Sequence, residues 1–326
     1  MKDYVIEPLR GIEYVYSNNT KLIKEVLSNR IPLDRKYHEL TVGKGMVIKV
    51  ALCHLTVKDF RFELIDALIL DAIASLYENG YFNFTTDMIA RVMYQNIHHR
   101  ITSKNLQTIQ ERMDLLLKLE IRINIDHELN SKRNPPMDDR LLNKSYNHFL
   151  PIKEVNAVFA VNSKEAKGYH FNRSPLCWEY AKYKKQIIKC RFGLYQLRDK
   201  NTTIEALLIM RYIHNRIELM KNKNNHIYND KISLYRITSD LVEHGVLPAC
   251  GIDQSSFKNW SAKHKKILEL INAFLEKLKN TSDKDMRIKG YQYYNIHGNE
   301  GYRIDVPKKS NKSNKSNKYY FKKKEN

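Results

Sequence analysis

The sequence has few of the residues that mark several common protein classes. Among 326 residues there are only 11 Gly and 8 Pro, which argues against a collagenous or turn-dense all-β chain. No G-x-x-x-x-G-K-[ST] loop is present, and this disfavours a nucleotide-driven helicase or switch. The 4 Cys form no C-x-x-C pair, so we expect neither a zinc cluster nor a disulfide framework, as fits a reducing cytosol.

Long apolar runs are also missing. The first residues lack the apolar stretch of a secretory signal, and the longest apolar stretch, residues 67–76, contains Asp71 and is too short to span a bilayer. We therefore expect a soluble, cytoplasmic protein with no membrane partner. A hydrophobic content of 42% still supplies enough apolar surface for folded cores.

Acidic residues are in deficit, because 36 Asp and Glu face 56 Lys and Arg, for a formal charge of +20. This excess favours a polyanionic partner, most often nucleic acid; a solubilising surface in a protein from an AT-rich genome is the alternative. Residues 307–326 hold eight lysines against one glutamate, with three Ser-Asn-Lys units. That composition cannot form a core, so we predict a disordered basic tail.

The apolar pattern predicts one order of elements twice. Helices are expected near 62–76, 85–93 and 102–117, followed by strand-like alternation at 121–125 and 155–161. After a short helix (174–183) and a strand (186–194), the order returns as a helix at 203–221, a short helix capped by Ser233, a long helix capped by Ser255 and Ser256, and a hairpin at 287–306.

The sequence therefore predicts an α+β fold of two tandem winged helix-turn-helix domains. The predicted organisation is an N-terminal extension (1–44), a first winged-helix domain (45–168), a second winged-helix domain (169–306) and the tail (307–326).

The two predicted third helices differ in charge. Residues 103–120 balance three basic against three acidic side chains, whereas residues 255–280 set six lysines against two glutamates. Helical geometry gives the second helix an outward face of Lys258, Asn259, Ala262, Lys265 and Lys266. Because Ala262 is small, this face of the helix can approach the floor of a major groove. There Asn can pair with adenine, and Lys can reach guanine or phosphate. The alternative is a lysine face that only contacts solvent. We expect Ser255 and Ser256, with the N-terminal amides, to hold a phosphate.

Auxiliary contacts are predicted elsewhere. In the second hairpin, Arg287, Lys289, Tyr291 and Arg303 are expected to follow the phosphate backbone or the minor groove, unless the tyrosines only pack in the sheet. The basic segment 182–200 either tracks phosphates or is a hydrated linker.

In the first domain, Lys104, Gln107 and Thr108 face outward beside Glu111 and Leu115, which are poor groove contacts. This domain is therefore predicted to dimerise, with auxiliary DNA contact.

Signatures of catalysis are poor, and we predict no catalytic residue, metal or cofactor. His98 and His99 are adjacent, whereas rolling-circle nucleases need two histidines flanking an apolar residue. Asp138 and Asp139 lie in a Pro-flanked polar loop without a partner acid, which is more typical of a solvated loop than of a magnesium site. His264 falls on the apolar stripe and is predicted to be a packed core histidine.

Two segments carry a resemblance. KCRFGLYQLRDKNTTIEALLIMRYIHNRI (189–217) and YENGYFNFTTDMIARVMY (77–94) are similar to parts of the initiator Rep proteins of iteron plasmids, which are tandem winged-helix proteins that bind directly repeated origin sequences. Proteins of Gram-positive mobile elements are also similar. The resemblance covers about residues 45–306, and the tail departs from the family's pattern. It implies that the second domain binds the repeats, that the first alternates between dimerising and contacting DNA, and that host replication proteins, such as a helicase or a DnaA-like initiator, are partners.

The sequence thus predicts a sequence-specific duplex DNA-binding protein that initiates replication of a plasmid or mobile element. A winged-helix transcriptional regulator is the nearest alternative, because both roles need only a positioned helix and wing. A non-specific RNA-binding or nucleoid protein, and a nuclease acting on origin DNA, are the alternatives from other classes.

Overall fold

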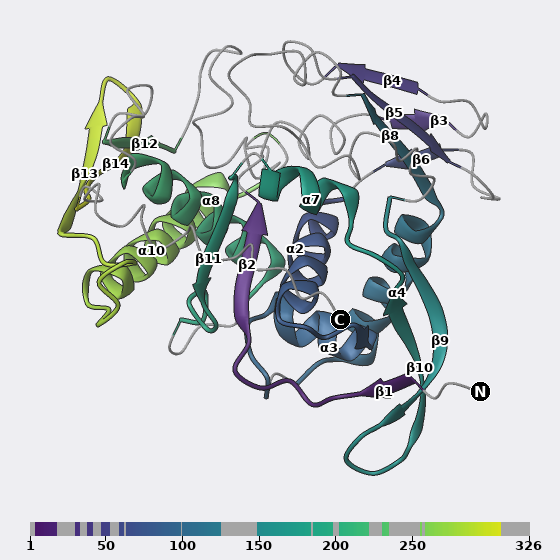
Figure 1. Ribbon diagram of the computed structural model, residues 1–326. Helices are drawn as coiled ribbons and strands as arrows, with labels where there is room; N and C mark the ends of the chain where they lie inside the picture. Colours follow the sequence, from purple (N-terminus) through teal and green to yellow (C-terminus); the bar gives the residue numbers. More distant parts are fainter. Residues whose placement is uncertain are drawn as a thin grey trace. The chain divides into compact units, whose positions relative to one another are not determined.

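The computed structural model describes residues 4–17, 30–32, 38–41, 47–52, 59–61, 63–98, 100–124, 149–183, 185–197, 202–221, 230–234, 255 and 258–307. It is a mixed α+β protein that divides into two compact units, unit 1 (Met1–Gln196) and unit 2 (Leu197–Asn326) (Figure 1). The predicted boundary after residue 168 therefore differs from the division in the structure, which follows Gln196. The predicted tail lies almost wholly outside the described residues.

The described part of unit 1 combines helices with a four-stranded sheet, a three-stranded sheet and two two-stranded ribbons. Its helices are α2 (Leu64–Glu78), α3 (Thr86–Met93), α4 (Ser103–Leu117) and α7 (Leu176–Tyr183). Its strands are β1 (Tyr4–Ile6), β2 (Glu13–Ser17), β3 (Arg30–Pro32), β4 (His38–Thr41), β5 (Val47–Leu52), β6 (Asp59–Arg61), β7 (Asn83–Phe84), β8 (Leu119–Asn124), β9 (Ile152–Phe159), β10 (Glu165–Phe171) and β11 (Ile187–Arg191). β3 pairs with β6, and β2 pairs with β11.

Local signals define the three helices that follow one another in unit 1. Thr85 and Thr102 are the N-caps of α3 and α4, and the side-chain oxygen of each accepts a backbone N–H from the first turn. Helix α2 ends at Asn79 and Gly80, where Gly80 has a φ of +82°. The predicted helices at 62–76, 85–93 and 102–117 are confirmed to within two residues at each end.

The core of unit 1 forms around α2, which is buried along most of its length. The core residues of this helix include Leu68, Ile69, Ala72, Ile73 and Leu76. A guanidinium also enters this interior: Arg112 of α4 donates to Asp66 at 2.8 and 2.5 Å and to Glu63 at 3.0 Å. These contacts hold the start of α2 against the third helix.

The N-terminal residues are part of unit 1 and not a separate extension. Strand β1 pairs in parallel with β9, and β2 pairs antiparallel with β11. Two polar side chains at the C-terminal end of α2 bind β2. Ser75 Oγ accepts the N–H of Val15 at 2.9 Å. The side chain of the C-cap Asn79 accepts the N–H of Glu13 and donates to its carbonyl oxygen, both at 2.9 Å. Pairing of β11 with β2 also explains why residues 169–196 lie in unit 1.

The strand pairing corrects the wing predicted for the first domain. The segments at 121–125 and 155–161 were expected to pair with each other, but β8 pairs with β5 in the sheet β4-β5-β8. Strand β9 instead forms a hairpin with β10, and the short strand β7 between α2 and α3 pairs with β10. The order in that sheet is β1-β9-β10-β7. Both segments were correctly predicted to contain strands, but pairing depends on contacts distant in sequence.

Unit 2 contains two long helices and one sheet. Its elements are α8 (Ile204–Lys221), β12 (Lys231–Ser233), α10 (Trp260–Lys279), β13 (Gly290–Ile296) and β14 (Asn299–Asp305), with the sheet order β12-β14-β13. Ser233 is the last residue of strand β12, and the helix that it was predicted to cap lies almost wholly outside the described residues. The short strand after the first helix again pairs with the last strand of the unit.

The β13–β14 hairpin is closed by a two-residue turn. His297 and Gly298 have φ of +51° and +80°, the left-handed pair that matches the twist of antiparallel strands. The loop predicted over 297–301 is therefore shorter in the structure, and β14 begins at Asn299. Gly301 is required by packing, since a Cβ there would overlap the carbonyl oxygen of Ile232 on β12.

Candidate nucleic-acid interface

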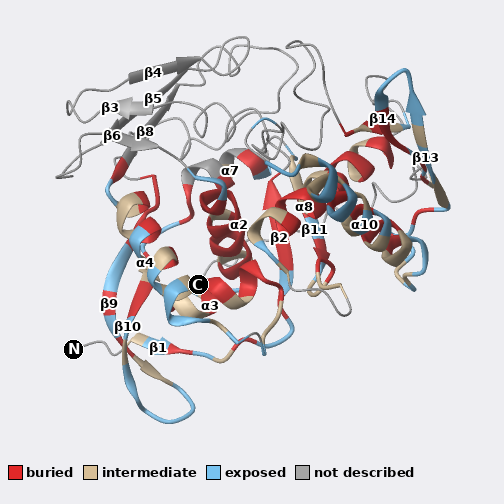
Figure 2. Ribbon diagram, turned by 180° about the vertical axis from the view of Figure 1, so that it is seen from behind, coloured by how far each residue is buried: buried red, intermediate tan, exposed pale blue. Residues whose placement is uncertain are grey.

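Helix α10 of unit 2 has one buried side and one exposed side (Figure 2). The buried side consists of Ile267, Ile271, Phe274, Leu275 and Leu278. The opposite side carries the exposed residues Ala262, Lys265 and Lys266, and the exposed Lys258 directly precedes the N-cap of the helix; we call these four residues the lysine face. This is the face that helical geometry predicted from the sequence, apart from Asn259.

The lysines of this face differ from their neighbour Lys263. Lys263 forms an ion pair with Glu205 of α8 at 2.5 Å. Lys258, Lys265 and Lys266 have no ion-pair partner among the described residues. Their charges are therefore available to an external anion.

The start of α10 differs from the prediction. Asn259 is the N-cap, and its Oδ1 accepts the N–H of Ala262 at 3.3 Å. Bidentate pairing with adenine uses the same oxygen, so the cap restrains the side chain that this contact would need. The helix N-terminal amides belong to residues 260 and 261, which moves the predicted phosphate site away from Ser255. Ser255 is exposed, and Ser256 lies outside the described residues.

Ser261 is a residue of this region that sequence reasoning missed. It is exposed and lies in the first turn of α10, beside the N-terminal amides that suit an anion. The signal in the sequence was Asn259, a favourable N-cap residue, but the two serines at 255 and 256 are equally favourable.

The four predicted residues of the hairpin fall into two groups. Arg287 and Lys289 precede β13 and are exposed, and the Arg287 Nε–H donates to the carbonyl oxygen of Lys279 at 3.2 Å. Tyr291 donates its hydroxyl to Glu276 Oε2 at 3.2 Å, and Arg303 forms an ion pair with Asp230 at 3.1 Å. The first two are oriented for an external contact, whereas the last two hold the unit together.

The Tyr291 contact joins the base of the hairpin to α10. Burial, followed by the hydrogen bond to Glu276, raises the pKa of the Tyr291 hydroxyl, so it stays protonated and donates. The hydrogen bond from Asn280, followed by the charge of Lys279, lowers the pKa of Glu276, so it stays ionised and accepts. The two groups therefore have complementary protonation states at neutral pH.

A second contact joins the hairpin to the second turn of α10. Glu300 of β14 is buried, with its side chain 8% exposed, and its Oε1 lies 2.9 Å from His264 Nε2. The Tyr293 hydroxyl donates to the other carboxylate oxygen, and Trp260 stacks on His264 with ring centroids 6.0 Å apart. His264 was predicted to be a core histidine; it is one-quarter exposed and lies between helix and hairpin.

Helix α4 of unit 1 presents a different surface. Lys104 and Gln107 are exposed and Thr108 is half-buried. Gln107 donates to Glu111 at 2.9 Å, and the Thr108 hydroxyl donates to the backbone oxygen of Lys104 at 3.0 Å. Since Arg112 is buried in its ion pair, the exposed part of α4 has less positive charge than the sequence count indicated.

The basic segment after α7 lies in unit 1, where acids compensate part of its charge. Lys182 forms an ion pair with Glu78 at 2.7 Å, and Lys189 lies 3.6 Å from Glu13. Residues 198–200 are outside the described part of the chain. The segment up to Gln196 is thus part of a folded unit, which differs from a hydrated linker.

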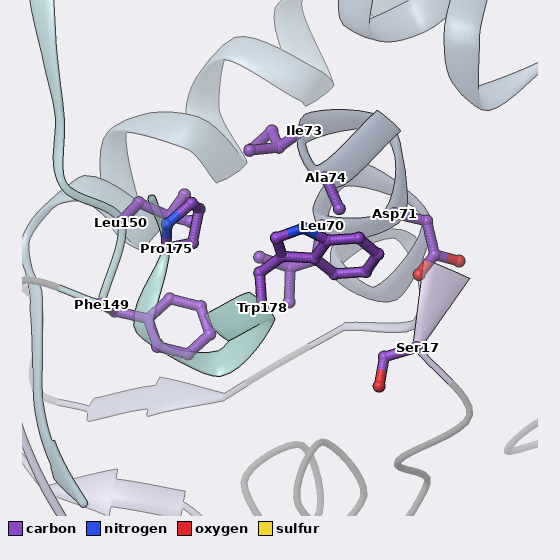
Figure 3. A pocket seen from close by; sticks show the side chains of 9 residues that line it. All are labelled: Ser17, Leu70, Asp71, Ile73, Ala74, Phe149, Leu150, Pro175 and Trp178. Atoms are coloured by element: carbon purple, nitrogen blue, oxygen red, sulfur yellow. The ribbon is translucent and has the colours of Figure 1, made fainter. Parts of the chain in front are cut away.

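Unit 1 also contains an apolar pocket (Figure 3). It is lined by Ser17, Leu70, Asp71, Ile73, Ala74, Phe149, Leu150, Pro175 and Trp178. Asp71 accepts a hydrogen bond from Tyr14 at 3.3 Å, and the Trp178 indole donates to Glu78 at 2.7 Å. Because its lining offers few polar groups, the pocket does not assemble a reactive site.

Metal and membrane sites were searched over the described part of the chain. It contains no group of three His, Cys, Asp or Glu side chains that could hold a metal ion. None of its helices has the length and hydropathy needed to cross a bilayer. His98 is exposed, whereas His99, Asp138 and Asp139 fall outside the described ranges.

Comparison with known proteins returned one weak similarity. No protein-family model and no curated protein matches this chain. A crystal structure of domains 2 and 3 of RctB is 12% identical to it and covers 88% of this chain and 97% of that one, with a TM-score of 0.39. A TM-score of this size does not show a shared fold.

Proposed function

We propose that this chain is a sequence-specific duplex DNA-binding protein built from two winged-helix domains, of which unit 2 reads the DNA. The topology of unit 1 supports this: α2, β7, α3 and α4 are followed, after β8 of another sheet, by β9 and β10, and β7 pairs with β10. Unit 2 repeats the relationship with α8, β12, α10, β13 and β14, where β12 pairs with β14. A winged helix has this order, with the third helix for the major groove.

The observation that carries the proposal is the lysine face of α10. It lies on α10, the helix that precedes the β13–β14 hairpin, opposite the buried side of that helix, and it includes the small Ala262. Lysines without internal partners can neutralise phosphates or reach guanine, while a methyl group leaves room for close approach to the base edges. Arg287 and Lys289 supply further cations on the same unit.

Within this proposal, unit 1 makes mainly protein contacts, including a homodimer, and touches DNA in an auxiliary way. The burial of Arg112, which leaves the exposed part of α4 without an excess of positive charge, supports this division. Charge reversal of Lys258 and Lys266 is expected to abolish site binding. Substitution of Lys104 and Gln107 should have a much smaller effect, and an equal loss would show that the division is wrong.

The biological role that we propose is initiation of replication at the origin of a plasmid or mobile element. The resemblance of segments 77–94 and 189–217 to iteron-plasmid initiators supports this role. Such an initiator acts by binding energy and by recruiting a host helicase or a DnaA-like protein, and it needs no catalytic residue or cofactor of its own. A transcriptional regulator with the same fold is the second candidate.

One experiment tests both levels of the proposal. Full-length protein is used to select duplexes from a random pool, and the selected duplex and DNA from the protein's own replicon are then footprinted. Directly repeated sites beside its own gene are expected for an initiator, whereas a promoter palindrome would favour the regulator. Competition with random duplex at physiological salt measures specificity. If the affinity for the selected duplex divided by the affinity for random duplex is near one, binding is not sequence-specific.

A further inference from the structure

The tip of the β13–β14 hairpin carries an exposed apolar side chain. Ile296, the last residue of β13, is 53% exposed and directly precedes the His297–Gly298 turn. Its neighbours Asn295 and Asn299 are exposed and polar. Resting on the proposed function, we propose that Ile296 is a wedge that enters the minor groove beside the site of α10 and unstacks one base-pair step.

The position of the tip supports this assignment. Ile296 pairs with Asn299, and Glu300 contacts His264 in the second turn of α10. Adjacent residues are 3.8 Å apart and paired strand residues about 5 Å apart, which places Ile296 within roughly 10 Å of Glu300. His264 immediately precedes Lys265 of the lysine face. The hairpin that carries the wedge is thus joined to the N-terminal part of α10, where Lys265 and Lys266 lie.

The tip is also supported rigidly, as a wedge must be. Glu300 is held by Tyr293 and His264, and Gly301 allows β12 to approach β14 closely. Ile is branched at Cβ and therefore has few side-chain conformations to lose. Proteins that kink DNA from the minor groove insert side chains of this kind between base steps. Unstacking one step costs a few kcal/mol, and the larger contact area between the protein and the bent DNA offsets that cost.

Unit 1 offers a matched control. Val161 is 75% exposed and lies between β9 and β10, so it is a β-branched apolar residue at the end of the corresponding hairpin. The neighbouring third helix α4 has no lysine face, so Val161 should not unstack the duplex.

The test uses full-length protein and the duplex selected above, labelled with 2-aminopurine at successive positions. The wild type should raise fluorescence several-fold at one step at the edge of the footprint, and a phasing assay should show a bend of roughly 20–90°. Ile296→Ser should bind but lose both signals, whereas Ile296→Met, Gln292→Ala and Val161→Ser should retain them.

Three results would overturn the wedge. They are binding by the wild type without a fluorescent step, retention of the signal in Ile296→Ser, and its loss in Val161→Ser. In all three, DNA binding persists and the proposed function stands. Failure of the wild type to bind any selected duplex would overturn the proposed function and the wedge together.

Discussion

The lysine face permits a quantitative prediction. Replacing Lys258, Lys265 and Lys266 together by Gln removes three charges that have no described ion-pair partner, and it leaves the buried side of α10 unchanged. Lys265 and Lys266 lie in the second turn of the helix, and Lys258 directly precedes its N-cap. They can therefore all reach the phosphates that border one major groove.

The size of the effect follows from counterion release. Each neutralised phosphate contributes about 0.9 to the slope of log K against log salt, so three contacts contribute about 2.7. At 0.15 M salt, each contact then corresponds to roughly 1 kcal/mol, and the triple variant should bind about 150-fold more weakly.

The assay is a titration of duplex with wild type and variant at several salt concentrations. Lys263→Gln is the control, because this lysine belongs to the same helix but is paired with Glu205. Loss of an exposed pair costs at most about 1 kcal/mol of stability, and the salt slope of DNA binding should not change. If the triple variant keeps the wild-type slope, or if Lys263→Gln lowers it equally, the lysine face does not contact phosphates.

The remaining predictions concern the supports of the two units. Arg112→Ala leaves Asp66 buried without its partner and should lower the free energy of unfolding by about 3–5 kcal/mol in urea denaturation, so a loss below 1 kcal/mol would contradict a buried pair. Asn259→Ala removes the cap of α10 and should cost about 1 kcal/mol, whereas Asn259→Asp should retain stability; equal losses would show that no cap exists. Gly301→Ala should disrupt the β12–β14 pairing, measured as faster hydrogen exchange in β14, and unchanged exchange would refute the close approach.

Helical structure was the part of the fold most accessible from sequence. The periodicity of Leu106, Ile109 and Met113, together with Thr102 as a cap, was sufficient to locate α4 to within one residue. These signals are local, because a helix bonds residues four apart and its apolar side repeats every 3.6 residues. The lysine face followed from the same geometry applied to α10.

Strand pairing could not be obtained in this way. The alternation of Ile121 and Ile123 identified β8, yet its partner β5 lies more than 60 residues earlier in the chain. The same holds for β11, which pairs with β2 and thereby brings the N-terminal residues into unit 1. Alternation shows that a segment is a strand but contains no information on its partner.

The candidate site likewise has features that are local in sequence and features that depend on distant segments. The sequence by itself determined which residues of α10 are exposed, because that follows from helical spacing. Only the tertiary structure decided that Asn259 is used as a cap, that Lys263 and Arg303 are paired, and that Ile296 lies near the start of α10. These outcomes depend on side chains that meet through the folding of distant segments, which no local pattern specifies.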